Sequence, residues 1–223
     1  MSNLAIIPAR GGSKRIPRKN IRDFLGKPII AYSIEVAVES GLFEEVMVST
    51  DNEEIAEVAK KFGAMVPFMR SKKAANDYAT LSDVVEEVKE AYWRKGKSYD
   101  NICCILPTAP FVTVSLLKKG LFLLSEYKVD SVRPVVCFSY PIQRAVKMNN
   151  GILEMFNPEH AKTRSQDLEP AFHDAGQYYW MKFSKGMKGE RKMGFEVSTH
   201  LVQDIDTEDD WRMAELKYRY TFG

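Results

Sequence analysis

The sequence has few cysteines and no long apolar segment. Only three cysteines occur in 223 residues, and two of them, Cys103 and Cys104, are adjacent. They make neither a disulfide framework nor a zinc site, so we interpret them as buried free thiols of a protein in the reducing cytoplasm. No apolar run approaches the roughly 20 residues that span a bilayer. The apolar N-terminal run Leu4–Ile7 is followed at once by Pro8 and Arg10, so we expect neither a membrane span nor a secretory signal.

Glycine and proline also lack any regular pattern. The 13 glycines and 10 prolines show no period, and we find no internal repeat, which excludes collagen-like and repeat architectures. Hydrophobic residues make up 45% of the chain and aromatic residues 11%, so global disorder is excluded as well. The length suits one buried core. We therefore predict a single domain over residues 1–223.

The net charge is small but unevenly distributed. The 32 basic and 30 acidic side chains give +2, which argues against a dedicated nucleic-acid binder. Residues 1–27 nevertheless hold seven basic side chains against one acidic side chain, and residues 204–210 hold five acids and no base. We call residues 8–20 the basic loop and residues 204–210 the acidic segment. These two oppositely charged regions are the first indication of function.

Short apolar runs alternate with amphipathic stretches through the first two-thirds of the chain. This alternation predicts an α/β fold with a doubly wound, mostly parallel sheet. Asp51, with Glu54 three residues later, is expected to cap the second helix. The predicted strands cover residues 4–7, 46–49, 65–68, 102–106, 131–137, 177–183 and 195–202. The predicted helices cover residues 28–40, 51–63, 80–94, 113–127 and 208–220.

The alternation breaks at about residues 139–172. Within this segment, residues 144–148 and 152–155 flank Asn149-Asn150-Gly151, which predicts a hairpin with an Asn-Gly turn. A polar stretch follows to Pro170. The segment is too small to bury a core of its own, so we interpret it as an insert for dimerisation that also serves as a lid.

The basic loop follows the first predicted strand directly. In open α/β sheets, ligands bind at the carboxyl ends of the strands. Gly11 and Gly12 allow backbone N–H groups to approach a phosphate, and the cations of the loop suit a triphosphate. The order Gly-Gly-Ser-Lys-Arg fits neither a Walker A loop nor a G-x-G-x-x-G dinucleotide motif. A solvated basic loop without a ligand is the alternative, and the position after the strand favours the phosphate site.

These residues carry a resemblance to a known family. The stretch Ile6–Asn20, IIPARGGSKRIPRKN, resembles the opening motif of the cytidylyltransferases that activate sialic acids and related keto-sugar acids. The resemblance continues in order through Gly26-Lys27-Pro28, Ser49-Thr50-Asp51, Phe68-Met69-Arg70, Leu106-Pro107-Thr108-Ala109-Pro110 and residues 204–209. It implies a nucleotide-diphospho-sugar transferase-like fold and a homodimer.

The resemblance also implies a reaction and a set of residues. CTP and a nine-carbon 2-keto sugar acid would give the CMP-sugar and pyrophosphate, with Mg²⁺ as cofactor. Arg10, Lys14 and Lys19 would bind the triphosphate and take part in catalysis. The remaining implied nucleotide contacts are Ala9, Gly11, Gly12, Asn20 and Arg70.

The acidic segment contains the candidate metal ligands. Asp204 and Asp206 are two residues apart, so in an extended segment both carboxylates point to one side. Hard oxygen ligands suit Mg²⁺, which also bridges to substrate phosphates. Alternatively, Asp206 or Thr207 caps the last helix, and the acids at 208–210 interact with its dipole. The family pattern favours metal binding for Asp204 and Asp206 and the helix role for Asp209 and Asp210.

Departures from the family pattern bear on the sugar. Sialic acid activators usually carry Gln where this chain has Leu106, and an apolar wall there suits a deoxy or methyl group. The late turn His173–Trp180, FHDAGQYYW with Phe172, resembles the branch of the family that activates pseudaminic acid, a dideoxy relative of sialic acid that ends in a methyl group. Sialic acid, legionaminic acid and the eight-carbon acid of lipopolysaccharide remain alternatives, as does a non-catalytic nucleotide-binding homologue.

Five further side chains are candidates for sugar contacts besides Leu106. Gln177 and Tyr179 share a face of a predicted strand, and we expect them to face the sugar. Arg144 and Arg164 are candidates for the substrate carboxylate, donated across a dimer. His173 is equally open to a structural role and to a role in the site.

Overall fold

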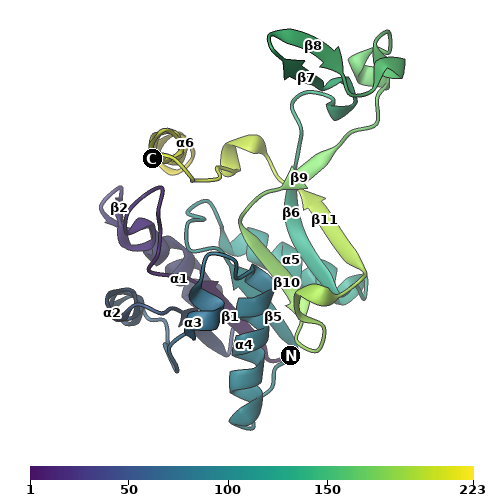
Figure 1. Cartoon of the computed structure of the whole chain (residues 1–223). Coiled ribbons are helices and arrows are strands. Elements are labelled where there is room, and N and C mark those ends of the chain that lie inside the picture. Colours follow the sequence, from purple (N-terminus) through teal and green to yellow (C-terminus); the bar gives the residue numbers. More distant parts are fainter.

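A computed structural model describes all residues, 1–223, and its centre is one twisted sheet (Figure 1). The strand order is β11-β6-β10-β5-β1-β4, and β9 pairs with β6. The strands of this sheet are β1 (Asn3–Pro8), β4 (Glu45–Ser49), β5 (Asn101–Ile105), β6 (Ser131–Cys137), β9 (Phe172–Asp174), β10 (Tyr178–Lys182) and β11 (Lys192–Glu196). The helices are α1 (Ile29–Ser40), α2 (Glu53–Lys61), α3 (Lys72–Ala75), α4 (Leu81–Arg94), α5 (Val114–Glu126) and α6 (Glu208–Phe222).

The sheet is mostly parallel, as predicted. β1 is parallel to β4 and β5, and β11 is parallel to β6. β10 lies antiparallel between β5 and β6, so β6 runs in the same direction as β5. Five strands therefore end at the same edge, and only β9 and β10 begin there. The predicted fold class is confirmed, and the antiparallel insertion of β10 is the feature that the sequence pattern did not predict.

Both faces of the sheet are covered, which explains the strands without polar alternation. In β1, Ala5 and Ile7 point into a core shared with α1, α2 and α5, whereas Leu4 and Ile6 point into a second core beneath α4. All four side chains are fully buried. A strand that is buried on both faces gains nothing from polar residues at alternate positions.

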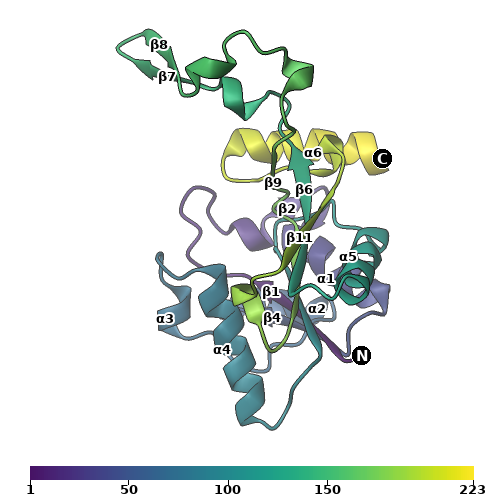
Figure 2. The ribbon, with the colours of Figure 1, turned by 90° about the vertical axis from the view of Figure 1, so that its right-hand side faces the viewer.

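A third core joins the two ends of the chain. Phe24 packs edge-on against Trp211 of α6 at 5.6 Å between ring centroids, and the same cluster contains Ile16 and Ile205. A short hairpin of β2 (Asp23–Phe24) and β3 (Lys27–Pro28) carries Phe24 into this cluster. Both views of the ribbon place α6 beside the N-terminal hairpin (Figures 1 and 2). We call this cluster the terminal core.

Five of the six helices begin with a side-chain cap, whereas α1 begins after Pro28 without one. Thr80 caps α4 in a capping box with Asp83, and Thr207 caps α6 in the same way with Asp210. The predicted cap at Asp51 is wrong, because the side chain of Asn52 accepts the bond from the N–H of Ile55 at 3.0 Å. The Asp51 carboxylate instead accepts from the N–H of Gly11 in the basic loop at 2.9 Å.

Two predicted strands differ from the structure. Residues 65–68 form only an isolated parallel bridge, between Met65 and Met47. The next residue whose N–H would bond to β4 is Pro67, and proline has no N–H to donate. The last strand is β11 at Lys192–Glu196 rather than residues 195–202. Residues Thr199–Leu201 form a 3₁₀ turn, because the polar Ser198-Thr199 pair follows Val197 where the pairing with β6 ends.

The insert projects away from the sheet (Figures 1 and 2). It contains the predicted hairpin, β7 (Val146–Asn149) and β8 (Ile152–Met155), with Asn150 and Gly151 at positive φ in the turn. Large apolar side chains on the hairpin are exposed, among them Met148 and Leu153. No helix of the chain has the length and apolar character that a membrane span requires.

Gly120 allows α5 to approach β10 closely. A Cβ at this position would lie 2.7 Å from the Cδ1 atom of Trp180, a side chain that is fully buried. The indole Nε1 of Trp180 donates to the carbonyl of Leu117 at 3.0 Å, which holds the ring in place.

We predict that Gly120→Val lowers the free energy of unfolding by about 1–3 kcal/mol, because the added atoms overpack this contact. Chemical denaturation followed by circular dichroism measures the change. Lys118→Ala, at an exposed position of the same helix, is the control and should leave stability within about 0.5 kcal/mol. Equal stability of Gly120→Val and the parent protein would contradict the packing described here.

Candidate active site

Two cavities lie at the carboxyl edge of the sheet and share one residue, Leu106. The first, about 370 Å³, is lined by the basic loop and by Pro107 and Thr108; we call it the basic cavity. The second, about 680 Å³, we call the wide cavity. The Leu106 backbone is fixed because its N–H donates to Gln177 and its carbonyl accepts from Ser33, each at 2.8 Å. The arrangement can hold two ligands whose ends meet at Leu106.

The basic cavity gathers four cations of the basic loop. Arg10, Lys14, Arg15 and Lys19 all line it. Asp77 accepts from both Arg10, at 3.1 Å, and Lys14, so a single acid from outside the loop orients two of the predicted triphosphate ligands. These bonds, that of Lys14 first, lower the pKa of Asp77, which keeps the carboxylate ionised.

The backbone of the loop is held from inside the fold. The amide of Asn20, which is buried, donates to the carbonyl of Arg10 at 2.9 Å. Ala9 is buried, and its N–H donates to Ser49 at 2.9 Å. The N–H of Gly11 is bound to Asp51, whereas Gly12 is exposed with open space around it. Asn20 lines the basic cavity beside Arg10, Lys14 and Lys19. The predicted nucleotide residues Ala9, Gly11 and Gly12 do not line it.

Lys19 connects the basic loop to the acidic segment. Its Nζ atom donates to the carbonyl of Ile205 at 2.6 Å and lies 3.4 Å from the carboxylate of Asp206. Arg15 pairs with the other oxygen of Asp206 at 2.9 Å. The two charged regions of the sequence therefore meet in space.

Arg70 lies beneath the loop rather than in either cavity. Its guanidinium is buried and donates to the hydroxyl of Ser49 at 3.0 Å and to the Ser49 carbonyl. Burial lowers the pKa of Arg70, and the nearby charge of Asp51 acts against that shift. In this arrangement Arg70 supports the end of β4 and lines neither the basic cavity nor the wide cavity.

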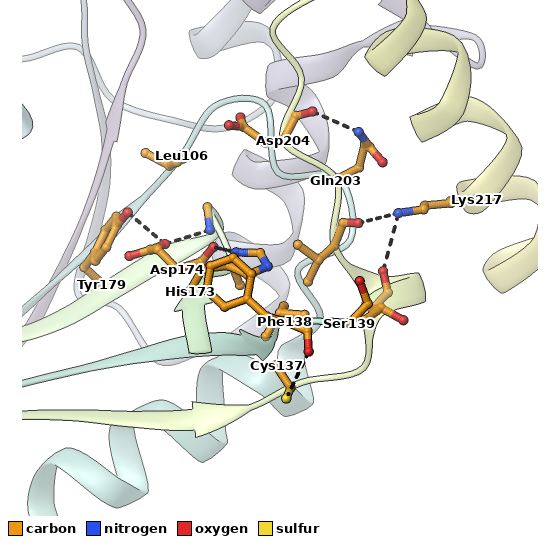
Figure 3. Close-up of a pocket in the computed structure, with 15 residues that line it drawn as sticks. Leu106, Cys137, Phe138, Ser139, His173, Asp174, Tyr179, Gln203, Asp204 and Lys217 are labelled. Carbon is orange, nitrogen blue, oxygen red and sulfur yellow. Dashed lines mark hydrogen bonds between the residues drawn. The ribbon is translucent and has the colours of Figure 1, made fainter. Parts of the chain in front are cut away.

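The wide cavity is formed at the ends of β6 and β9 and by the chain before α6 (Figure 3). The predicted sugar residues Leu106, His173 and Tyr179 all line it. The His173 ring contacts Phe138 in a tilted arrangement, with 4.8 Å between ring centroids, and its Nδ1 atom lies 2.9 Å from the carbonyl of Asp174. The wall is half apolar, which suits a ligand with both hydroxyl and methyl groups.

A bonded group around Asp174 holds one side of the wide cavity. The carboxylate accepts from Arg133 at 3.0 Å, from Tyr179 at 3.1 Å and from the N–H of Gly176 at 2.7 Å. Arg133 also lies over the Tyr179 ring, 5.0 Å from its centroid. Burial and the Asp174 charge raise the pKa of Tyr179, so the phenol stays protonated and can donate.

Gln177 has a different environment from Tyr179. It is buried, and its Nε2 atom donates to the carbonyl of Leu201 at 2.6 Å. Its Oε1 atom is buried and has no hydrogen-bond partner. Gln177 does not line the wide cavity. Within this chain it ties β10 to the 3₁₀ turn that leads to the acidic segment.

Arg144 and Arg164 lie on the insert, and neither lines the wide cavity. Arg144 is exposed and reaches only Ser165, at 3.5 Å. The ribbon views show the insert extending away from the sheet edge (Figure 2). One protomer alone therefore does not bring these two arginines to the sugar residues.

The two predicted metal ligands lie on either side of Ile205. Asp204 is exposed and lines the wide cavity, while Asp206 faces Lys19. No group of three or more His, Cys, Asp or Glu side chains that could hold a metal is present. The acidic segment therefore offers a metal at most two carboxylates, of which Asp204 faces the wide cavity and Asp206 is paired with Arg15 and Lys19. That number fits Mg²⁺, which takes one or two carboxylates and completes its shell with water and phosphate oxygens.

Three side chains that contact or line the candidate site were not predicted from the sequence. Asp77 orients Arg10 and Lys14, and Arg133 supports Asp174, but both lie outside any motif and depend on tertiary contacts. Lys217 of α6 lines the wide cavity. Its position on an amphipathic helix, next to half-buried Tyr218, was the one signal that could have indicated an inward-facing charge.

Comparisons with known proteins show the family to which the chain belongs. The sequence profile of the family described as cytidylyltransferase matches residues 4–220. A pseudaminic acid cytidylyltransferase of Campylobacter jejuni is 45% identical over 98% of this chain and 97% of that protein. A Helicobacter pylori protein, "Pseudaminic acid cytidylyltransferase and UDP-2,4-diacetamido-2,4,6-trideoxy-beta-L-altropyranose hydrolase", is 37% identical over 92% of this chain and 40% of its own length.

Solved structures show the same fold. A CMP:2-keto-3-deoxy-manno-octonic acid synthetase complexed with CTP superposes with a TM-score of 0.71 over 99% of both chains, at 17% identity. The 4-diphosphocytidyl-2C-methyl-D-erythritol synthase of Anaerococcus prevotii superposes with a TM-score of 0.64 over 98% of both chains, at 12% identity. From the family match over nearly the whole chain and the relatives that share its length, this chain belongs to the cytidylyltransferase family.

Proposed function

We propose that this protein transfers a cytidylyl group from CTP to pseudaminic acid, giving CMP-pseudaminic acid and pyrophosphate. The observation that carries the proposal is the meeting of the basic cavity and the wide cavity at Leu106. A triphosphate in the first and a sugar in the second would place the α-phosphate next to the sugar hydroxyl. The full-length similarity to the Campylobacter jejuni pseudaminic acid cytidylyltransferase supports the choice of sugar.

The reaction follows from charge and position. The anomeric hydroxyl of the sugar acid attacks the α-phosphorus of CTP in line, the bond to the β-phosphate oxygen breaks, and pyrophosphate leaves. Negative charge spreads over the phosphoryl oxygens, so catalysis consists mainly of positioning and electrostatic stabilisation. Arg10, Lys14 and Lys19 line the basic cavity where that charge develops.

Mg²⁺ is the proposed cofactor, and Asp204 and Asp206 are the residues that would hold it. When bound, the ion would neutralise phosphate charge and orient the leaving pyrophosphate. Asp206 would also orient two cations of the basic loop, because it forms ion pairs with Lys19 and Arg15. Its position therefore depends on the basic loop as well as on the ion.

The apolar lining of the wide cavity supports a deoxy sugar. Leu106 offers no hydrogen bond from its side chain where a glutamine would bind a hydroxyl, so a substrate with a methyl or deoxy group loses nothing there. Phe138 and Val136 extend the apolar wall. Tyr179 and His173 add polar groups to the lining of the same cavity.

We further propose that the protein is a homodimer in the cytoplasm, with the insert as the interface. Exposed apolar side chains on one hairpin, such as Met148 at 69% and Leu153 at 62% exposure, are typical of a surface that a partner covers. A partner would also bring Arg144 and Arg164 toward a neighbouring wide cavity. Fully buried free thiols at Cys103 and Cys104 suit a reducing compartment.

The proposed activity is tested by pyrophosphate release with CTP, Mg²⁺ and a panel of nonulosonic acids. We expect turnover with pseudaminic acid, at least about tenfold lower kcat/KM with sialic and legionaminic acids, and loss of turnover when EDTA replaces Mg²⁺. Turnover with sialic acid but not with pseudaminic acid would contradict the assignment of the sugar substrate and leave the enzyme class unaffected. No turnover with any acid would contradict the enzyme assignment, and full activity in EDTA would contradict the metal.

The dimer is tested by sedimentation equilibrium. The parent protein should sediment with twice the 25.5 kDa chain mass. Met148→Lys with Leu153→Glu places opposite charges on cross-strand partners, which leaves the hairpin paired but disrupts an apolar interface. We expect this variant to sediment as a monomer. Met213→Lys with Tyr220→Glu, at exposed apolar positions of α6, is the control and should remain dimeric. A parent protein that sediments as a monomer would overturn the proposal.

A further inference from the structure

The wide cavity contains one lysine side chain. Its lining includes the acids Asp174 and Asp204, the imidazole of His173 and a single lysine, Lys217, and no arginine. Lys217 reaches the cavity from the second half of α6, below the segment that carries Asp204 (Figure 3). Because Arg144 and Arg164 lie on the insert, Lys217 is the cation that a protomer supplies to its own cavity.

Backbone carbonyls do not satisfy the Lys217 ammonium completely. Its Nζ atom donates to the carbonyl of Val202 at 2.8 Å and, at the limit of a hydrogen bond, to that of Thr199 at 3.5 Å. An ammonium has three donors. Lys217 forms no ion pair with a carboxylate, so at least one N–H remains for a ligand. The partial burial of the side chain lowers the pKa of Lys217, as expected for a cation without a negative partner.

Neither acid of the cavity forms an ion pair with Lys217. The Asp174 carboxylate is already bound by Arg133, Tyr179 and the N–H of Gly176. Asp204 points into the cavity and forms no ion pair with Lys217. An anionic ligand would therefore find one cation without a carboxylate partner in a partly apolar cavity, where a charge-assisted hydrogen bond is stronger than at an exposed surface.

We propose that Lys217 binds the carboxylate of the sugar acid within the same protomer. This inference rests on the proposed function, in which the ligand of the wide cavity is a 2-keto sugar acid. In such an acid, the carboxylate is bonded to the anomeric carbon that carries the attacking hydroxyl. A cation that holds the carboxylate therefore also orients the nucleophile toward the α-phosphate. Lys217 is a substrate-binding residue in this account.

A purely structural role for Lys217 makes a different prediction. In that role, Lys217 would only connect α6 to the turn at residues 199–202 through hydrogen bonds to two backbone carbonyls. Its loss would then weaken neutral and anionic ligands alike and lower the thermal stability. The carboxylate contact instead predicts a loss that is confined to ligands carrying the negative charge.

The test compares Lys217→Met and Lys217→Arg with the parent protein, using pseudaminic acid and its neutral carboxamide. We expect Lys217→Met to raise the KM for the acid roughly 10- to 100-fold, the range for a lost charged hydrogen bond. The KM for CTP should change less than about twofold, and the inhibition constant of the carboxamide should stay the same. Lys217→Arg should recover most of the affinity for the acid.

Arg219→Met, two residues further along α6 at an exposed position, is the control for loss of one positive charge and should behave as the parent protein. If Lys217→Met weakens the binding of the acid and of the carboxamide equally, the proposal is overturned in favour of the purely structural role. An unchanged KM for the acid would overturn it as well. If the parent protein turns over no sugar acid, the proposed function itself fails, and that outcome is distinct from both.

Discussion

The site depends on the apolar contact between the two ends of the chain. Phe24, carried by the N-terminal hairpin, and Trp211, on the C-terminal helix, are fully or almost fully buried against each other in the terminal core. Arg22 strengthens the same contact, because it lies over the Trp211 ring at 4.6 Å and pairs with Glu208 at 2.5 Å. Burial of aromatic side chains supplies most of the energy of such a contact. Without it, only the polar contacts of Lys19 and Arg15 with Ile205 and Asp206 would hold the acidic segment next to the basic loop.

The contact with the acidic segment allows several cations to lie close together in the basic cavity, although like charges repel one another. Four cations line the basic cavity, and a group of that kind is unfavourable unless acids lie near it or an anion binds. Asp77 and Asp206, each bound to two of these cations, provide the compensation within the protein. A triphosphate carries more negative charge than these two carboxylates, so the cavity has a strong electrostatic preference for it.

The sequence predicted most of this arrangement and missed the parts that depend on tertiary contacts. Motifs and periodicity identified the sheet class, the basic loop, the insert and the acidic segment, because each is encoded by neighbouring residues. The antiparallel position of β10 and the pairing of Asp77 with Arg10 join residues far apart in the chain, and no local pattern encodes them. Asp51 illustrates the limit, since its position before α2 predicts a cap, whereas competition from Asn52 frees it to bind Gly11.

The central claim is that the two charged regions at opposite ends of the chain form one catalytic site, and Asp206 tests it most directly. Asp206→Asn keeps the shape of the side chain but removes the charge that faces Lys19 and Arg15. Asp209→Asn removes a neighbouring charge that is 93% exposed and lies outside both cavities. We predict that kcat for CMP-sugar formation falls at least about 100-fold in Asp206→Asn, with an unchanged circular dichroism spectrum, and stays near the parent value in Asp209→Asn. Near-normal turnover by Asp206→Asn, or an equal loss in both variants, would contradict the claim.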